Sequence, residues 1–548
     1  MTSAGYHRRV GSVARRAIAA WMLAAAPLAA PARAADASPV VSVDGGRVAG
    51  STEAGGAPLS VFRGIPFAAA PVGALRWRAP QPVARWHGIR PATAFGARCM
   101  QQPLFSDMMF RSPGISEDCL YLNVWSPAMP AGRTAAMPAR RTAARLPVLV
   151  YIHGGGCVAG DGSERRYDGA ALARRGIVVV TLNYRLGAFG FLAHPALTAE
   201  SPHHASGNYG LLDQVAALDW VKRNVAAFGG DPARITIGGE SAGSMSVSVL
   251  MASPLSRGSI AGAIGESGAA MQKHSPQPLA AFEAKGTAFA AAIGANDLAA
   301  LRALPADRLL AAQAAAADLP ARPVVDGYLL TEAPAVTFAA GRAAHVPLLV
   351  GSNSQEAPAA ALLGEAAPTL AAYRAGLARR LGTGADAVFA LYPARSDADV
   401  LAMATAVASD DFLALPTWKW FDLQRRSGAP TYLYNYERVR PRFLADPGSR
   451  AAWGAVHSAE IEYALGNLDT NPIYAWTAAD RQVSATMSGY WANFVATGDP
   501  NGAGLPVWPR ATADEGAIRR QIIDVDTRSA PFPEQRRYVA AEPLLVLR

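Results

Sequence analysis

The feature that most constrains the fold is a serine between two glycines at the junction of a strand and a helix. Residues 239–243 read Gly-Glu-Ser-Ala-Gly and match the pattern G-x-S-x-G. They follow a β-branched run at residues 235–237 and precede an apolar stretch at residues 244–251. So tight a turn leaves almost no room for side chains beside Ser241. The segment predicts a nucleophile elbow, which exposes the serine hydroxyl at the start of a helix.

Short apolar segments alternate with helical ones along the rest of the chain. Five segments are predicted to be strands: residues 149–152, 177–182, 235–237, 348–350 and 431–436. Several are apolar at nearly every position, as strands buried on both faces of a parallel sheet are. A helix is predicted at residues 211–228, stopped by the Gly-Gly-Asp-Pro of residues 229–232. The alternation predicts an α/β fold with a mostly parallel central sheet and helices on both faces.

Two segments interrupt this alternation. Residues 278–318 and 368–412 are rich in Ala and Leu and are predicted to be helical. We interpret them as insertions that cover the active-site end of the sheet.

Ser241 requires a base, because a serine hydroxyl is a poor nucleophile at neutral pH. In an elbow architecture the order along the chain is serine, acid, histidine. Only His274, His345 and His457 follow Ser241, and His457 lies late in the chain, after the strand predicted at residues 431–436. His457 is therefore the predicted base.

The acid is expected shortly after a strand that lies between the serine and the histidine. Glu356 meets this condition, since a short polar loop separates it from the strand predicted at residues 348–350. Its role would be to accept the N–H of His457 and to stabilise the imidazolium. Asp326, Asp410 and Asp411 are alternatives that spacing alone does not exclude.

A second glycine-rich turn, residues 154–156, follows another predicted strand. Glycine lets a backbone approach a substrate oxygen closely. We predict that the N–H groups of Gly155, Gly156 and Ala242 form an oxyanion hole. His153 precedes the serine, so the order rule argues against a catalytic role, and we expect it to hold the loop by a hydrogen bond.

The first 34 residues have the layout of a secretory signal peptide. Four arginines lie in residues 1–16, an apolar run fills residues 17–30, and Ala32-Arg33-Ala34 supplies a cleavage pattern. Cleavage would lower the formal charge from +9 to +4. We expect export to the periplasm or the exterior, with residues 35–548 as a single domain.

The remaining charge gives little reason to expect a polyanionic partner. One basic cluster exists, comprising Arg133, Arg140, Arg141 and Arg145. No aromatic residues interleave it, as recognition of nucleic acid by stacking would require. No other apolar run reaches the roughly 18 residues of a membrane span, so none is expected.

The sequence suggests no cofactor and no metal. The adjacent His203 and His204 lack the i, i+4 spacing of a helical zinc pair. The oligomeric state is not indicated.

These segments together resemble the type-B carboxylesterase/lipase family of the α/β-hydrolase fold, over nearly the whole chain after the signal peptide. Residues 117–125, Glu-Asp-Cys-Leu-Tyr-Leu-Asn-Val-Trp, match one family signature, and residues 228–243 match the other. Further similar blocks lie at residues 63–68, 71–73, 183–187, 207–214, 491–501 and 508–509. The resemblance implies the triad Ser241, Glu356 and His457.

The resemblance also implies that Cys99 pairs with Cys119, which an exported protein permits. Cys157 is then unpaired and occupies a position where the family usually has an aromatic residue. This departure changes the wall beside the oxyanion hole. A small buried residue is the favoured interpretation of Cys157 over a reactive thiol.

A second departure concerns the loop between the paired cysteines. Cholinesterases of this family place a Trp there to bind a quaternary ammonium group. Residues 100–118 contain none and offer Met108, Met109 and Phe110 instead. We therefore expect no specificity for choline esters. The cluster either lines an adaptable apolar pocket or belongs to the core.

The leading hypothesis is an exported serine hydrolase that cleaves small-molecule carboxylic esters through an acyl-enzyme intermediate. The alternative is a non-catalytic secreted binding protein on the same fold. Such relatives typically lose the serine, so the retention of Ser241, Glu356 and His457 favours the enzyme. The natural ester is not indicated.

Overall fold

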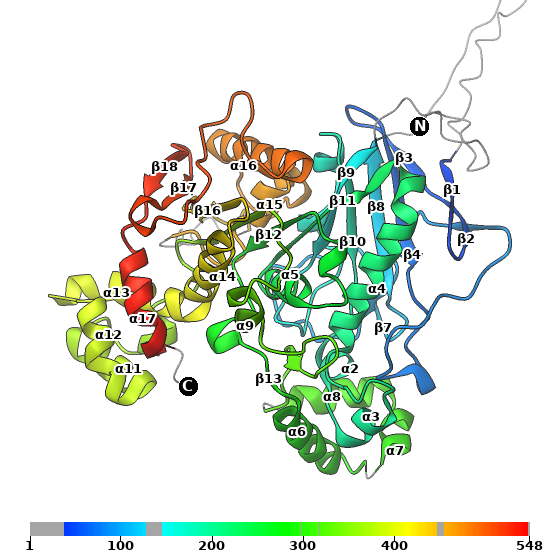
Figure 1. Ribbon diagram of the computed structural model, residues 1–548, viewed down its shortest axis with the longest axis horizontal. Helices are drawn as coiled ribbons and strands as arrows, with labels where there is room; N and C mark the ends of the chain where they lie inside the picture. Colours follow the sequence, from blue (N-terminus) through cyan, green and yellow to red (C-terminus); the bar gives the residue numbers. More distant parts are fainter. Residues whose placement is uncertain (1–37, 128–144, 296, 317, 446–453, 546–548) are drawn as a thin grey trace, which may run out of the picture. The chain divides into compact units, whose positions relative to one another are not determined.

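An eleven-stranded sheet forms the centre of the protein (Figure 1). The computed structural model describes residues 38–127, 145–295, 297–316, 318–445 and 454–545. The predicted signal peptide, and Arg133, Arg140 and Arg141 of the basic cluster, lie outside the described residues. The strands, in their order across the sheet, are β18 (Arg528–Pro531), β17 (Arg519–Ile523), β16 (Thr431–Tyr436), β15 (Leu348–Asn353), β12 (Gly262–Glu266), β11 (Gly230–Glu240), β9 (Leu146–Ile152), β10 (Val178–Leu182), β8 (Tyr121–Pro127), β4 (Leu59–Pro66) and β3 (Ser51–Glu53).

The middle of the sheet is parallel and its edges are antiparallel. From β10 through β9, β11, β12, β15 and β16 to β17, every pair of neighbours is parallel. The pairs β10–β8, β8–β4, β4–β3 and β17–β18 are antiparallel. The carboxyl ends of the parallel strands therefore meet at one edge, where loops from distant parts of the sequence converge.

Helices cover both faces, as alternate side chains of one strand show. Val148 and Val150 of β9 belong to one buried cluster, whereas Leu149 and Tyr151 belong to another. The first cluster includes residues of α4 (Tyr209–Asn224), α5 (Ala242–Ala252) and α14 (Leu415–Arg426). The second includes residues of α1 (Ala170–Ala173), α15 (Ile461–Ala464) and α16 (Ala478–Thr497). The predicted mostly parallel sheet with helices on both faces is confirmed.

One strand is longer than predicted. The run at residues 235–237 predicts a short strand, but β11 spans Gly230–Glu240 and begins directly after Gly229. Gly230 pairs with Leu146, and the register then shifts before Ile235. The helix predicted at residues 211–228 is α4 followed by a 3₁₀ turn, Val225–Phe228, which ends at Gly229 with a φ of 86°. The left-handed glycine thus turns the chain directly into the strand.

The two predicted insertions are helical and lie in separate places (Figure 1). The first comprises α6 (Leu279–Ala292), α7 (Leu298–Ala303) and α8 (Ala306–Ala315), whose residues share a buried cluster with Trp77 and Phe189. The second comprises α11 (Leu370–Leu381), α12 (Ala385–Leu391) and α13 (Asp397–Ser409), which contact α10 (Ala360–Leu363) and α17 (Gln535–Leu545). Among the described helices, none combines the length and apolar character needed to cross a membrane.

Candidate active site

Ser241 occupies a strained turn between β11 and α5. Its φ is 55° and its ψ is −120°, a conformation that a residue with a side chain rarely adopts. A Cβ atom on Gly239 would lie 2.6 Å from the carbonyl oxygen of Ile152, and one on Gly243 would lie 2.1 Å from it. Only glycine fits on either side of the serine, so the local sequence accounts for the turn.

A hydrogen-bonded chain connects Ser241 to the predicted base and acid. His457 Nε2 lies 3.0 Å from Ser241 Oγ, and His457 Nδ1 lies 2.8 Å from Glu356 Oε2. The serine follows β11, the glutamate follows β15, and the histidine lies in the loop after β16. The three predicted side chains, up to 216 positions apart in sequence, therefore meet at the carboxyl edge of the sheet.

The second carboxylate oxygen of Glu356 is also occupied. The backbone N–H of Asn353 donates to Oε1 at 2.6 Å, which fixes the carboxylate relative to the end of β15. Glu356 itself is buried. A carboxylate held at both oxygens orients the imidazole and selects the tautomer with the proton on Nδ1.

The three alternative acids have other partners. Asp326 accepts backbone N–H groups within its own loop. Asp410 accepts the hydroxyl groups of Tyr392 and Tyr538. Asp411 pairs with two basic side chains. The structure brings Glu356, and none of these aspartates, to the imidazole.

Glu240 is a further acidic residue at the site, which the sequence reasoning missed. Its Oε1 lies 3.2 Å from His457 Nε2, and its side chain is buried. Burial lowers the pKa of His457, but the charges of Glu240 and Glu356 outweigh it, so the pKa is raised above its usual value. Burial raises the pKa of Glu240, and His457 partly counteracts this. The available signal was an acid directly before the nucleophile.

The predicted oxyanion donors face no competing acceptor. The N–H groups of Gly155 and Gly156 have no hydrogen-bond acceptor among the described residues. Ala242 is the first residue of α5, and the helix's first hydrogen bond runs from Met245 N to Ser241 O. The N–H of Ala242 therefore precedes the intrahelical pattern and carries the positive end of the helix dipole.

His153 holds the glycine-rich turn, as the order argument predicted. Its Nδ1 lies 2.9 Å from the carbonyl oxygen of Gly154, and its ring stacks on Tyr184 at 4.3 Å. The Tyr184 hydroxyl donates to the His153 carbonyl at 3.0 Å. Burial lowers the pKa of His153 to about 4, so the ring is neutral at physiological pH.

The cysteines are arranged as the resemblance implied. Cys99 and Cys119 form a disulfide. Cys157 is a buried free thiol, and burial raises its pKa to about 12. A thiol that stays protonated at neutral pH is a weak nucleophile, which agrees with a packing role.

The methionine cluster contributes at least one residue to the site. A Cβ atom on Gly155 would lie 3.2 Å from the methyl carbon of Met108. Met108 therefore borders the predicted oxyanion turn. Phe110 instead packs against Arg98, whose guanidinium carbon lies 5.0 Å from the centroid of the Phe110 ring. The position of Met108 supports the pocket interpretation for that residue.

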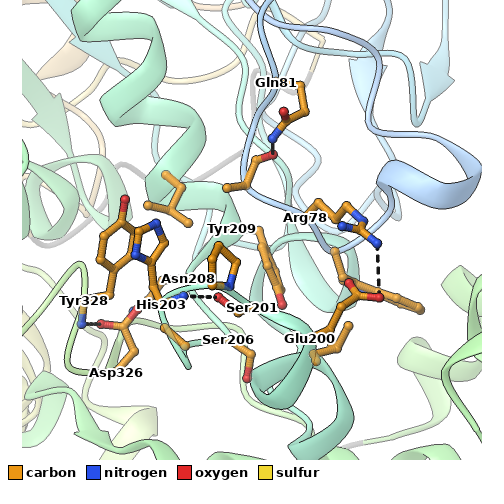
Figure 2. Close-up of a pocket in the computed structure, with 16 residues that line it drawn as sticks. Arg78, Gln81, Glu200, Ser201, His203, Ser206, Asn208, Tyr209, Asp326 and Tyr328 are labelled. Carbon is orange, nitrogen blue, oxygen red and sulfur yellow. Dashed lines mark hydrogen bonds and ion pairs between the residues drawn. The ribbon is translucent and has the colours of Figure 1, made fainter.

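A separate cavity of about 250 Å³ lies beside α3 (Pro195–Glu200) and the start of α4 (Figure 2). None of the predicted catalytic residues lines it. Figure 2 shows Arg78 paired with Glu200, and His203 beside Tyr328, whose ring it stacks on at 3.6 Å. Within the described ranges, no three His, Cys, Asp or Glu residues are grouped as metal ligands.

The class of α/β-hydrolases is defined by a mostly parallel sheet that carries a serine elbow, with an acid and a histidine in loops after later strands. Residues 37–535 match the model of the Carboxylesterase family, and the chain belongs to that family.

Curated relatives are similar over most of their length. Fumonisin B1 esterase of Sphingopyxis macrogoltabida is 37% identical over 483 residues, covering 84% of this chain and 83% of that protein. Para-nitrobenzyl esterase of Bacillus subtilis (strain 168) is 36% identical over 514 residues, covering 91% of this chain and 97% of that protein. A solved structure of a thermophilic PNB esterase superposes with a TM-score of 0.76 at 33% identity, covering 91% of this chain and 99% of that one.

The family and these relatives identify the chain as a carboxylic ester hydrolase, an enzyme that acts on small esters. These findings favour the hydrolase over the alternative of a non-catalytic binding protein on the same fold.

Proposed function

We propose that the protein is an exported serine hydrolase that cleaves carboxylic esters through an acyl-enzyme formed on Ser241. The observation that carries the proposal is the continuous chain of hydrogen bonds from Ser241 Oγ through His457 to Glu356. A base within 3.0 Å of the hydroxyl, oriented by a buried acid, is the arrangement that activates a serine.

The reaction proceeds in two halves. Ser241 Oγ attacks the ester carbonyl while His457 Nε2 takes the hydroxyl proton, and the same nitrogen then protonates the departing alcohol. In the second half His457 takes a proton from water, which attacks the acyl carbon. The bond between that carbon and Ser241 Oγ then breaks, and His457 returns the proton to Oγ as the acid leaves. Glu356 keeps the Nδ1–H of the imidazole in place and stabilises its positive charge in both halves.

The negative charge on the carbonyl oxygen develops beside the glycine-rich turn. We assign the N–H groups of Gly155, Gly156 and Ala242 to its stabilisation. Because these N–H groups belong to the backbone, they are in place before the substrate binds and need no reorganisation during the reaction.

Export and domain organisation belong to the same proposal. Residues 1–34 are removed as a signal peptide, and residues 35–548 remain as one domain. The disulfide between Cys99 and Cys119 supports an oxidising compartment, since such bonds are rare in reducing ones.

The experiment is covalent labelling of the mature protein with a fluorophosphonate, combined with hydrolysis of a short-chain aryl ester. We expect wild type to be labelled and Ser241→Ala to be unlabelled, with kcat reduced by roughly 10⁴-fold or more. Ser259→Ala is the matched control, since Ser259 ends a 3₁₀ turn (Arg257–Ser259) and accepts a hydrogen bond from Lys222. Full activity or labelling of Ser241→Ala would contradict the proposal.

A further inference from the structure

A cavity of about 380 Å³ shares Glu356 with the proposed triad. Its walls are mostly aliphatic and come from α10, α11, α13 and α17, through residues such as Leu362, Leu381 and Val407. The polar part of the wall consists mainly of Lys273, Arg380 and Asp411. The cavity thus combines an apolar chamber with a small charged group at one side.

The two carboxylates on this wall are engaged differently: Glu356 is held by His457 and the backbone N–H of Asn353, whereas Asp411 lies between two cations. Asp411 Oδ2 lies 2.9 Å from Lys273 Nζ and 2.8 Å from an Arg380 guanidinium nitrogen, so one carboxylate serves two cations. Burial lowers the pKa of Lys273, the charge of Asp411 opposes this, and the charge of Arg380 adds to it.

Lys273 is the more confined of these cations, with 19% of its side chain exposed, against 54% for Arg380. A cation in a partly desolvated place is unfavourable unless an anion offsets it, and Lys273 shares its carboxylate with Arg380. Each cation also keeps N–H groups that point away from Asp411, because an ammonium has three donors and a guanidinium has five. The wall can therefore bind a second carboxylate.

The cation-lined cavity lies close to the reacting atoms. Lys273 Nζ is 5.6 Å from the ring centroid of Phe412, and the Phe412 ring is 5.7 Å from the ring of His457. The usual helical donor to the carbonyl oxygen of Phe412 would be residue 416, but this is a proline and has no N–H. His274 Nε2 lies 2.7 Å from that oxygen instead. One aromatic ring therefore separates the cation from the proposed base, a span that a short aliphatic chain can bridge.

We propose that this cavity is a subsite for a substrate carboxylate, bound by Lys273 and Arg380. The preferred substrates are then esters in which an aliphatic chain ends in a carboxylate on either the acid or the alcohol side. This inference rests on the proposed function, since it concerns which esters reach Ser241. Charge-assisted hydrogen bonds offset the cost of taking the carboxylate out of water.

The test compares matched pairs of esters on the mature enzyme. For the acid side, the pair is the 4-nitrophenyl monoester of adipic acid and 4-nitrophenyl hexanoate. For the alcohol side, the pair is 6-acetoxyhexanoate and hexyl acetate. Members of a pair have equal length and differ in a terminal carboxylate or methyl group. The readout is the ratio of kcat/KM, anionic over neutral, so any general loss of activity divides out.

We expect this ratio to exceed one in at least one pair, and that pair identifies the side of the ester that carries the carboxylate. Lys273→Met should lower the ratio about tenfold through a higher KM for the anionic ester, and Lys273→Arg should restore most of it. Lys222→Met removes the same charge from an exposed position on α4 and should leave the ratio unchanged.

Ratios below one in both pairs, or an unchanged ratio in Lys273→Met, would overturn the subsite. The proposed function fails separately, if the neutral esters are hydrolysed equally well by Ser241→Ala. The two failures are therefore distinguishable in one set of assays.

Discussion

The catalytic corner and the cation-lined cavity are adjacent, yet different parts of the fold build them. The catalytic corner comprises Ser241, Glu356, His457 and the turn at residues 154–156, all at or beyond the ends of parallel strands. The cavity takes most of its wall from helices of the second insertion and from α17. Strand ends are fixed by the hydrogen bonds of the sheet, whereas helix side chains vary without displacing the sheet.

This difference suggests a division of labour. In the proposed mechanism the catalytic corner sets the rate of bond cleavage, because its atoms must keep their positions within tenths of an ångström. In the proposed subsite the cavity selects which esters bind, because it would contact parts of the substrate that do not react. Changes in the corner should reduce kcat with every ester, and changes in the cavity should alter ratios between esters.

The largest effect is expected for Glu356→Gln. A glutamine cannot satisfy the N–H of His457 and the N–H of Asn353 together, since one of its two positions is an NH₂ group. We expect kcat to fall by about 10³–10⁴ with every ester, as for other triad acids replaced by amides. Steady-state kinetics on the neutral ester pair measures this.

Asp326→Asn makes the same chemical change at an aspartate that does not contact the histidine. It should keep kcat within a few-fold of wild type. A comparable loss in both variants would show that the triad geometry is not what sets the rate.

A smaller loss is expected for Gly155→Ala. The residue has a φ of 98°, and its Cβ would lie 2.2 Å from the carbonyl oxygen of Ala159, so the turn must move. Displacing an oxyanion donor costs about 10²–10³ in kcat. Gly176→Ala, with a φ of 87° and open space around the Cβ, controls for backbone strain alone. Equal kcat in the two variants would remove the turn from the catalytic corner.

Glu240→Gln should move the pH profile rather than abolish activity. His457 acts as a base only when neutral, so kcat/KM falls as the pH drops through the pKa of His457. The charge of Glu240 raises that pKa, and its removal should shift the acid limb to lower pH by about one unit. Glu283→Gln, remote from the histidine, is the control. An acid limb that stays in place or moves upward would contradict the assignment.

The smallest effect is expected for Ala361→Phe, which fills part of the cavity from α10. The kcat/KM for 4-nitrophenyl hexanoate should fall about three- to tenfold relative to that for 4-nitrophenyl acetate. A steric change in an apolar pocket seldom has a larger effect than this. Ala366→Phe, which does not line the cavity, should leave this ratio unchanged. An unchanged ratio in both would separate the cavity from substrate binding.

The elbow, the class of fold and the histidine were predictable from the sequence. The glycines beside Ser241 follow from contacts within a few ångströms of the turn, and the order of serine and histidine is a property of the chain. Apolar runs likewise predicted β9, β10, β15 and β16 to within a few residues. The start of β11 escaped prediction, because Gly230 becomes strand only by pairing with Leu146.

Spacing alone left Glu356 and three aspartates as possible acids, and the packing of the fold brings Glu356 to the imidazole. It also placed Glu240 against His457 and gathered Lys273, Arg380 and Asp411 on one wall. The physical reason is the same in each case. Local sterics act between neighbours in the sequence, whereas charge pairing and cavities depend on side chains that meet only when distant segments pack together.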